Sequence, residues 1–295
     1  MSEPARAAQL RILAGIDLSE RSRDAFLRAV QLAKAGGGSL TLVHVTSDAF
    51  PQKLVAEHDS HARDVLEEHA LKARAEGVGE VAQTIAYGRD YEQLIEHARK
   101  DRADLIVLGR HRPSSVLQDM LGTTVDRVLR LGGVPVLTVQ QKVEQPYNSI
   151  LVAVDFSPAS RRALEQAVRW FPQARITAIT AYGIPRRSLF AGGAAGQSEA
   201  QTHKLALKGF LGEFAQALGP DYAATTAGIV PVVEHGWPED VILRAVDENK
   251  PDLLVLGTHA RSGIGHAVLG SVAEWVLLEA PCDVLAVPPR AIAHR

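Results

Sequence analysis

The chain has 295 residues, enough for two ordinary domains that each have a core of their own. A formal net charge of −2 provides no bulk attraction to nucleic acid or to an anionic membrane. Cys282 is the only cysteine, which excludes an intrachain disulfide, and no apolar run approaches the roughly 20 residues of a membrane span. Residues 1–11 also have no apolar core of signal-peptide length. We therefore expect a cytoplasmic protein with no nucleic-acid and no membrane partner.

Short apolar runs alternate with helical patterns along the whole chain. The predicted strands lie at 11–16, 39–45, 80–87, 104–108 and 135–139 in the first half, and at 150–155, 175–182, 227–234, 252–256 and 283–287 in the second. The runs at 105–108 and 253–256 are apolar at every position, which is typical of parallel strands covered on both faces. Strands that alternate with helices predict an α/β fold with a doubly wound sheet in each half.

The two halves repeat one another from the first strand onward. The segment from Ile12 to Asp17 aligns with 150–155 at an offset of 138, and each copy ends in an aspartate followed by a serine suited to cap a helix. Pro158 then stands at the first helical position of the second copy. The helices share an apolar register of i, i+3, i+4 and i+7, formed by Phe26, Ala29, Val30 and Ala33 in one copy and Leu164, Ala167, Val168 and Phe171 in the other.

A repeat of this length is too long for a solenoid unit and indicates duplication of a whole domain. We predict domains at 1–145 and 146–295, joined near 142–147. Further along the chain the offset becomes 148, because the segment that starts at Asp104 is repeated from Asp252. Ten extra residues must therefore lie between the two repeated blocks. We place them at 183–201, where an Ala- and Gly-rich run predicts a flexible loop.

The later repeat has the pattern of a loop that holds phosphate. In the second half a glycine, Gly257, closes an apolar strand, and Gly270-Ser271 opens a helical pattern 13 residues later. Glycine allows close approach of the backbone to a ligand, and a helix start offers N–H groups to an anion. Asp155 ends the first strand at the same edge of the sheet and is suited to accept from a ribose hydroxyl. The alternative is purely structural: a strand end, a helix cap and a helix-start residue.

Other classes of site lack their motifs. The chain has no G-x-G-x-x-G after either first strand, no G-x-x-x-x-G-K-[ST] and no G-x-S-x-G, which disfavours dinucleotide dehydrogenases, P-loop NTPases and α/β-hydrolases. His58, His61 and His69 fall on a predicted helix rich in acidic residues. We interpret them as part of a solvated charged face and predict no metal site.

The segment from Gly257 to Ser271, followed by the strand at 283–287, resembles the universal stress protein family, whose nucleotide signature is G-x2-G-x9-G-[ST]. The resemblance covers nearly the whole chain and implies two tandem domains, each with a five-stranded parallel sheet in the order 3-2-1-4-5. It also implies that ATP or a related adenine nucleotide is the ligand. The binding residues that it implies in the second domain are Asp155, Tyr182 at the end of strand 2, Leu256, Gly257, His259, Gly270, Ser271 and Val272. Ala260 occupies a further position of the signature, and Arg261 in the same loop is suited by its charge to cover phosphate. Those in the first are Asp17, Val45, Gly109, His111, Gly122 and Thr123.

Each domain departs from the signature at its second glycine. The second domain has Ala260 there, a single added methyl group. The first has Arg112 followed by Pro113, and a residue before proline is restricted to extended backbone. Tyr182 is also larger than the valine usual in the family. We therefore expect the second domain to keep a nucleotide site and the first to have a degenerate one.

Three functional classes remain open. The first is a nucleotide-binding stress-response regulator, and the second is an interaction module that has lost nucleotide binding. The third is a slow ATPase, although no catalytic residue and no carboxylate cluster for magnesium is evident. Two homologous domains in one chain are expected to pair as single-domain relatives do when they dimerise, and the sequence leaves a further homodimer open. Protein partners are not indicated.

Overall fold

The computed structural model describes residues 7–49, 51–110, 124–183, 194–258 and 269–289. The chain divides into two compact units, whose main parts are Ala8–Pro146 and Tyr147–Arg290. Each unit is an α/β domain with its own sheet and core.

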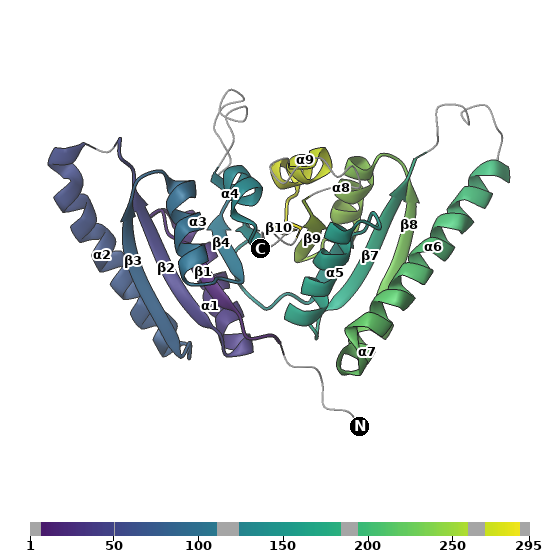
Figure 1. Ribbon diagram of the computed structural model, residues 1–295, viewed down its shortest axis with the longest axis horizontal. Coiled ribbons are helices and arrows are strands. Elements are labelled where there is room, and N and C mark those ends of the chain that lie inside the picture. Colours follow the sequence, from purple (N-terminus) through teal and green to yellow (C-terminus); the bar gives the residue numbers. More distant parts are fainter. Residues whose placement is uncertain (1–6, 50, 111–123, 184–193, 259–268, 290–295) are drawn as a thin grey trace, which may run out of the picture. The chain divides into compact units, whose positions relative to one another are not determined.

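The first domain alternates strands and helices throughout. Its elements are β1 (Arg11–Gly15), α1 (Glu20–Gly36), β2 (Ser39–Thr46), α2 (Gln52–Ala75), β3 (Glu80–Tyr87), α3 (Asp90–Lys100), β4 (Leu105–Gly109), α4 (Thr124–Gly132) and β5 (Val136–Val139). The strands are parallel and lie in the order β3-β2-β1-β4-β5. Helices α1 and α2 cover one face of the sheet, and α3 and α4 cover the other (Figure 1).

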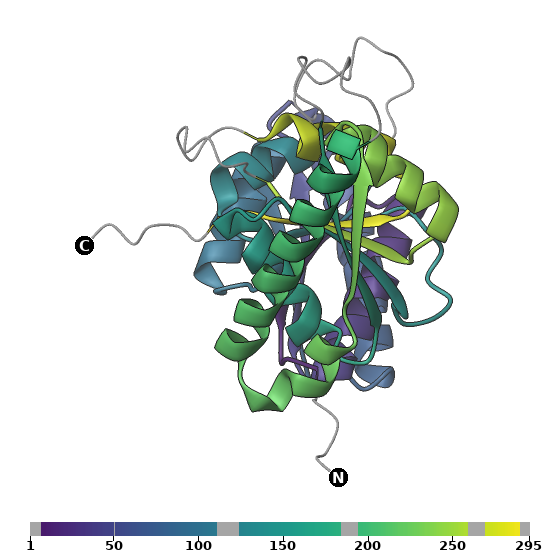
Figure 2. The same cartoon turned by 90° about the vertical axis from the view of Figure 1, so that its right-hand side faces the viewer.

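The second domain repeats this arrangement. Its elements are β6 (Ser149–Ala153), α5 (Pro158–Trp170), β7 (Arg175–Tyr182), α6 (Ala194–Leu218), the 3₁₀ turn η2 (Pro220–Tyr222), α7 (Ala223–Ala227), β8 (Val230–His235), α8 (Pro238–Asn249), β9 (Leu253–Gly257), α9 (Ser271–Glu279) and β10 (Asp283–Val287). The parallel order is β8-β7-β6-β9-β10, and α6 lies along β8 (Figure 2). In each domain this is the predicted order 3-2-1-4-5, so the expected fold is confirmed.

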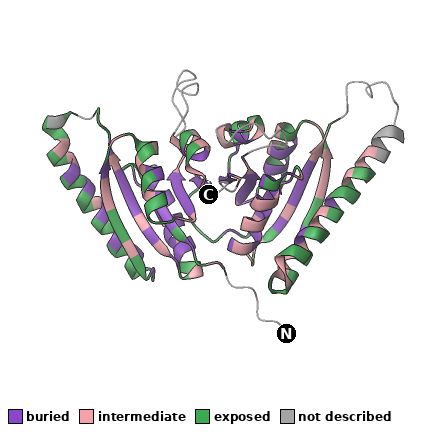
Figure 3. Cartoon of the chain, in the orientation of Figure 1, coloured by how far each residue is buried: buried purple, intermediate pink, exposed green. Residues whose placement is uncertain are grey.

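The core of each domain lies on the central strands. The apolar runs of β4 and β9 are almost completely buried, with at most 6% of any of the residues 105–108 and 253–256 exposed. Figure 3 shows the same concentration of buried residues on the middle strands and on the helix faces turned toward them. The eight residues of the predicted helix register are all buried, which confirms that register in α1 and in α5 with its C-cap residue Phe171. None of the described helices combines the length and apolarity that a membrane span requires.

The predicted helix caps are also present. Ser19 precedes α1 and accepts from the backbone N–H of Ser22, and Ser157 accepts from the N–H of Ser160 at 3.1 Å before α5. Pro158 occupies the first turn of α5, where a backbone N–H has no helical partner. These caps place the start of each helix three positions after the aspartate that follows the first strand.

The ten extra residues of the second domain are predicted from the sequence to lie at 183–201. The structure shows that they are not confined to that segment. Ala194 follows the end of β7 by twelve positions, whereas Gln52 follows the end of β2 by six, and 194–201 belongs to α6. A second share lies after the helix, where η2 and α7 separate α6 from β8. Alanine tolerates a helix interior well, so an Ala-rich run that contains glycine is an ambiguous loop signal.

The aspartates that open the later repeat lie at the opposite end of the sheet from the strand–helix turns. Asp252 accepts from the backbone N–H groups of Asn148 and Ser149 at 2.8 and 2.9 Å, just where β6 begins. Asp104 likewise accepts from the backbone and side chain of Arg11 at the start of β1. These carboxylates fix the amino ends of the first strands and take no part in the site described next.

Candidate functional site

The candidate site of the second domain lies where β6 and β9 end side by side. The two strands are parallel neighbours, with Val152 opposite Val255 in the register. Gly257 is the last residue of β9 and Asp155 lies two positions beyond β6, so both are at the carboxyl edge. The helices that follow, α5 and α9, pack on opposite faces of the sheet. This is the switch point of a doubly wound sheet, where ligands bind in such folds.

The turn after the first strand of each domain has a strained backbone. Leu18 has a φ of 64° and Phe156 a φ of 66°, in the left-handed region that non-glycine residues rarely adopt. In both turns the aspartate just before accepts from the backbone N–H two residues on, at 2.9 Å for Asp17 and 2.9 Å for Asp155. Strain of this kind is often found at functional sites. The sequence contains no signal for it, because leucine and phenylalanine are not residues that favour positive φ.

In the first domain the aspartate is held in its ionised form. Burial raises the pKa of the Asp17 carboxyl, but hydrogen bonds from the Ser19 hydroxyl and N–H and from Ser22 outweigh that effect and bring the pKa below its ordinary value. A carboxylate that is ionised at neutral pH only accepts hydrogen bonds. It therefore suits a donor such as a sugar hydroxyl.

Gly257 has a packing reason to be glycine. A Cβ on this residue would lie 2.7 Å from the carbonyl carbon of Ala159 and 2.8 Å from the nitrogen of Ser160, both in the first turn of α5. The sequence suggested instead that this glycine gives a ligand access to the backbone. The close approach of α5 is sufficient to explain the residue, so the glycine alone is no evidence for a ligand.

A backbone hydrogen bond holds the start of α9 against the end of β9. The N–H of Gly270 donates to the carbonyl of Thr258 at 2.7 Å, and the N–H of Thr258 donates to Val287 of β10 at 3.0 Å. The predicted free N–H of Gly270 is therefore occupied, which corrects the sequence interpretation at that residue. The helix nevertheless begins at Ser271, as predicted, and Gly270 provides no side-chain cap.

The other predicted residues near the start of α9 differ in which of their groups a ligand can reach. Ser271 is exposed and Val272 is half-buried, and their N–H groups belong to the first turn, where no intrahelical acceptor exists. Leu256 is only 3% exposed because its side chain lies in the core. A ligand at the edge can therefore reach only the backbone of Leu256, but it can reach the hydroxyl of Ser271.

Tyr182 is not the register counterpart of Val45, the residue that the resemblance implies at the end of strand 2 in the first domain. Arg175 of β7 pairs with the first residue of β6 as Ser39 pairs with the first residue of β1, so Ala181 corresponds to Val45. Tyr182 corresponds to Thr46 and its ring stacks on His203 of α6, with centroids 5.2 Å apart. Successive side chains of a strand point to opposite faces, so Tyr182 faces α6 and Ala181 faces away from it. A contact between Tyr182 and a nucleotide remains a prediction.

The described part of the first domain has the same arrangement at the carboxyl end of its fourth strand. Gly109 ends β4, and the N–H of Arg110 donates to Val139 of β5 at 2.9 Å, as Thr258 does to β10. Several predicted positions lie outside the described residues: His111, Arg112, Pro113, Gly122 and Thr123 in the first domain, and His259, Ala260 and Arg261 in the second.

The histidines of α2 do not all lie on a solvated face, contrary to the sequence interpretation. His58 Nε2 lies 3.0 Å from Nε2 of the buried His44 of β2, and the ring of His69 packs edge-on against Phe26. Only His61 is exposed. Among the described residues, no group of three or more His, Cys, Asp or Glu side chains is placed to hold a metal ion.

Comparison with known proteins identifies the family. The model of the universal stress protein family matches residues 10–140 and again 146–288, so this chain belongs to that family as a tandem member. A curated relative, universal stress protein E of Photorhabdus laumondii, is 24% identical over 94% of each chain. The crystal structure of a universal stress protein from Archaeoglobus fulgidus has a TM-score of 0.71 at 21% identity and covers 95% of this chain and 98% of its own. Another solved structure, which matches 45% of this chain with a TM-score of 0.39, is a universal stress protein in complex with cAMP.

Proposed function

We propose that this protein is a nucleotide-binding stress-response regulator that holds ATP or a related adenine nucleotide mainly in its second domain. The observation that carries the proposal is the hydrogen bond from Gly270 to Thr258. It fixes the start of α9 at the carboxyl end of β9, whose parallel neighbour β6 ends two positions before Asp155. A helix N-terminus, an exposed hydroxyl and a carboxylate then meet at one switch point.

Each of these groups suits a different part of a nucleotide. The uncapped first turn of α9 and the Ser271 hydroxyl offer hydrogen-bond donors to phosphate oxygens, and the helix dipole favours their negative charge. The carboxylate of Asp155 is an acceptor for the ribose hydroxyls. Membership of the universal stress protein family supports the same class of ligand. A conformational response to the nucleotide is what would make such a protein a regulator.

Titration of the full-length chain with ATP, after removal of any co-purified nucleotide, tests the proposal by calorimetry. We expect Asp155→Ala to weaken binding about tenfold, because a hydrogen bond to a charged group is lost. Gly270→Val should weaken it at least as much, since Gly270 has an extended backbone that accepts valine and the side chain would cover the helix start. The matched control is Asp17→Ala, which removes the equivalent turn carboxylate from the first domain.

The outcome separates the two domains. Binding that falls with Asp155→Ala and changes less than about twofold with Asp17→Ala supports a site in the second domain. Loss of binding with Asp17→Ala alone would place the nucleotide in the first domain. No saturable binding by the wild-type chain, and no nucleotide in protein purified from cells, would favour the interaction module without a nucleotide.

A further inference from the structure

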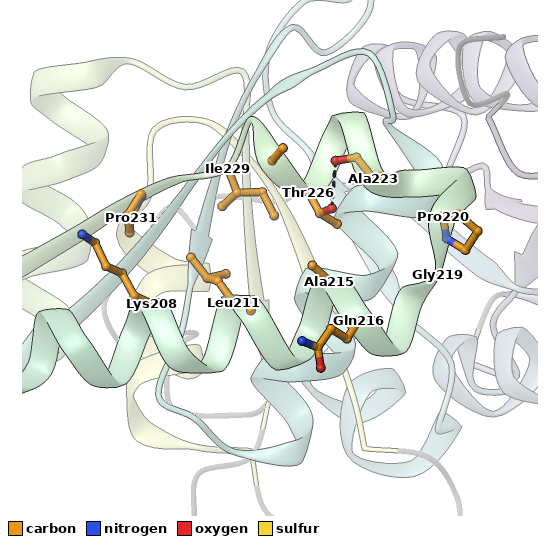
Figure 4. Close-up of a pocket in the computed structure, with 12 residues that line it drawn as sticks. Lys208, Leu211, Ala215, Gln216, Gly219, Pro220, Ala223, Thr226, Ile229 and Pro231 are labelled. Carbon is orange, nitrogen blue, oxygen red and sulfur yellow. Dashed lines mark hydrogen bonds between the residues drawn. The ribbon is translucent and has the colours of Figure 1, made fainter. Parts of the chain in front are cut away.

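A groove of the second domain lies at the amino end of β8, away from the carboxyl ends of the strands. It is an open groove of about 600 Å³ between the C-terminal half of α6, the η2–α7 segment and the start of β8 (Figure 4). Sites for small molecules commonly have volumes of about 300–1,000 Å³. The groove borders Ile229 and Pro231, at the amino end of β8, whereas the proposed nucleotide site is at the carboxyl ends of the strands.

The groove is built by part of the insertion that distinguishes the second domain. In the first domain β3 begins five positions after the end of α2, but β8 begins twelve positions after the end of α6. The additional residues form η2 and α7, which pack on α6 and make the far wall of the groove. The groove therefore belongs to the second domain and is not a property of the shared fold.

The walls are mainly apolar, small side chains predominate, and Gln216 and Thr226 are the uncharged polar residues that line the groove. Leu211 of α6 faces Ile229 across the groove, and Ala215 faces Thr226 of α7 (Figure 4). The hydroxyl of Thr226 in α7 is engaged at 3.0 Å by the carbonyl of Tyr222, so it adds no free donor. Walls of this kind favour the burial of an apolar part of a ligand.

Gly212 widens the groove at a position where glycine is otherwise unfavourable. It lies in the interior of α6, where glycine costs about 1 kcal/mol relative to alanine. A Cβ at this position would meet nothing within 4 Å. Packing within the protein therefore does not require glycine here, and the space above it opens into the groove.

Lys208 provides a single charge at the end of the groove (Figure 4). Among the described residues its ammonium group has neither an ion pair nor a hydrogen bond, and it is the only charged side chain that lines the groove. Pro231 removes one N–H from the edge strand β8, which disfavours the addition of a strand from another chain. We propose that this groove binds an amphipathic monoanion, a medium-length apolar chain with its carboxylate at Lys208.

Decanoate is a suitable probe, with decan-1-ol as an uncharged molecule of the same chain length. Displacement of a fluorescent fatty acid from the full-length protein measures both affinities. We expect wild type to bind decanoate more tightly than decan-1-ol, and Lys208→Met to weaken decanoate about threefold with little change for the alcohol, as for an exposed ion pair. Lys204→Met removes a lysine one turn earlier on α6, outside the groove, and should change neither affinity.

Filling the groove tests the position of the ligand. Gly212→Leu should weaken both probes by at least about tenfold, because the side chain enters the space that the chain occupies. Gly209→Leu is the matched control, since Gly209 also has nothing within 4 Å of a Cβ but does not line the groove. Equal binding by Gly212→Leu and wild type, or no saturable binding of decanoate, would overturn the proposal. So would dissociation of an oligomer by Gly212→Leu without decanoate binding, which would make the groove a contact between copies of the chain.

Discussion

In the first domain, the ends of the second and third strands are tied to their helix by hydrogen bonds. Thr46 and Tyr87 lie opposite each other in the register of β2 and β3. Both hydroxyls donate to Asp59 of α2, at 3.2 and 2.6 Å. The Tyr87 bond is the main reason that the pKa of the Asp59 carboxyl lies below its ordinary value. This edge is therefore a polar cluster in which the carboxylate is the common acceptor.

The same backbone positions in the second domain carry rings. Tyr182 and His235 are the register pair that corresponds to Thr46 and Tyr87, and the ring of Tyr182 packs on His235 and on His203 of α6. The outer helix, α2 in the first domain and α6 in the second, is thus attached by hydrogen bonds in the first domain and by ring stacking in the second. The strained turn after the first strand is alike in both domains. The two domains therefore share the arrangement of the first and fourth strands and the turn after the first strand. They differ in the contacts between the second and third strands and the outer helix.

The largest effect on stability is expected at Gly257, in the part that the two domains share, where the packing leaves no room for a side chain. A Cβ on Gly257 would lie 2.7–2.9 Å from backbone and side-chain atoms of Ala159 and Ser160. Because the nearest atoms are backbone, α5 would have to move, and we expect Gly257→Ala to lower the free energy of unfolding by about 3 kcal/mol. Urea denaturation followed by circular dichroism measures the change.

Gly209→Ala is the control for that substitution in the part where the two domains differ. Gly209 lies inside α6, and a Cβ there would meet nothing within 4 Å. Alanine should raise the stability by about 0.5–1 kcal/mol through its helix propensity. An unchanged unfolding midpoint for Gly257→Ala would contradict the close packing of α5 on β9.

The turns after the first strands should respond differently to the same substitution. Leu18→Gly relieves the positive φ, a gain of about 1 kcal/mol that the added chain entropy largely offsets. Phe156→Gly also relieves the strain but removes a ring that packs edge-on against Phe210 of α6, with centroids 5.6 Å apart. We expect a loss of about 2 kcal/mol for Phe156→Gly and a change within about 0.5 kcal/mol for Leu18→Gly. Hydrogen exchange resolved by peptide would assign each change to its domain, and equal losses would show that the turns are not anchored differently.

The arrangement that the two domains share could be predicted from the sequence because its signals are periodic. The buried runs at 105–108 and 253–256, the helix register from Phe26 and the cap at Ser157 each follow from local pattern. The position of Gly257 at the carboxyl edge follows from the same pattern. The helix start at Ser271 could likewise be read from its preceding glycine.

The remaining features depend on contacts between distant segments, which no local pattern carries. The positive φ of Phe156 and the clash that excludes a Cβ at Gly257 arise from packing against helices elsewhere in the chain. The one-residue offset at Tyr182 depends on strand register, which an ungapped alignment does not reveal. An ungapped alignment also does not reveal that the insertion is divided between the two ends of α6.

A histidine of the first domain extends the comparison to pH. His44 of β2 is buried, and its Nδ1 lies 2.7 Å from the carbonyl oxygen of Ile16. A carbonyl only accepts, so Nδ1 carries the proton, and Nε2 is left to accept from Nε2–H of His58 at 3.0 Å. The register counterpart of His44 in the second domain is Thr180, which has no group that titrates near neutrality.

Protonation of His44 is therefore expected to oppose folding. Burial and the neighbouring His58 lower the pKa of His44 below 6.5, although the Ile16 carbonyl and the carboxylates of Asp59 and Asp17 act in the opposite direction. When the pH falls through about 6.5, the unfolded chain takes up a proton that the folded domain does not, so stability decreases until the lowered pKa is reached. One pH unit below 6.5 this loss can be at most about 1.4 kcal/mol, the limit for a histidine that takes up no proton in the folded domain.

The variant His44→Gln should be less stable than wild type at pH 7.5, because glutamine replaces both ring contacts imperfectly, but its stability should fall less between pH 7.5 and 5.5. His61→Gln changes an exposed histidine on the same helix as His58 and should keep the wild-type slope. Exchange rates of peptides from β2 and α2, followed across this range, report the first domain separately from β7 and α6. If His44→Gln and wild type lose protection in parallel, the pH response does not come from His44, and the histidine pair is only a packing contact.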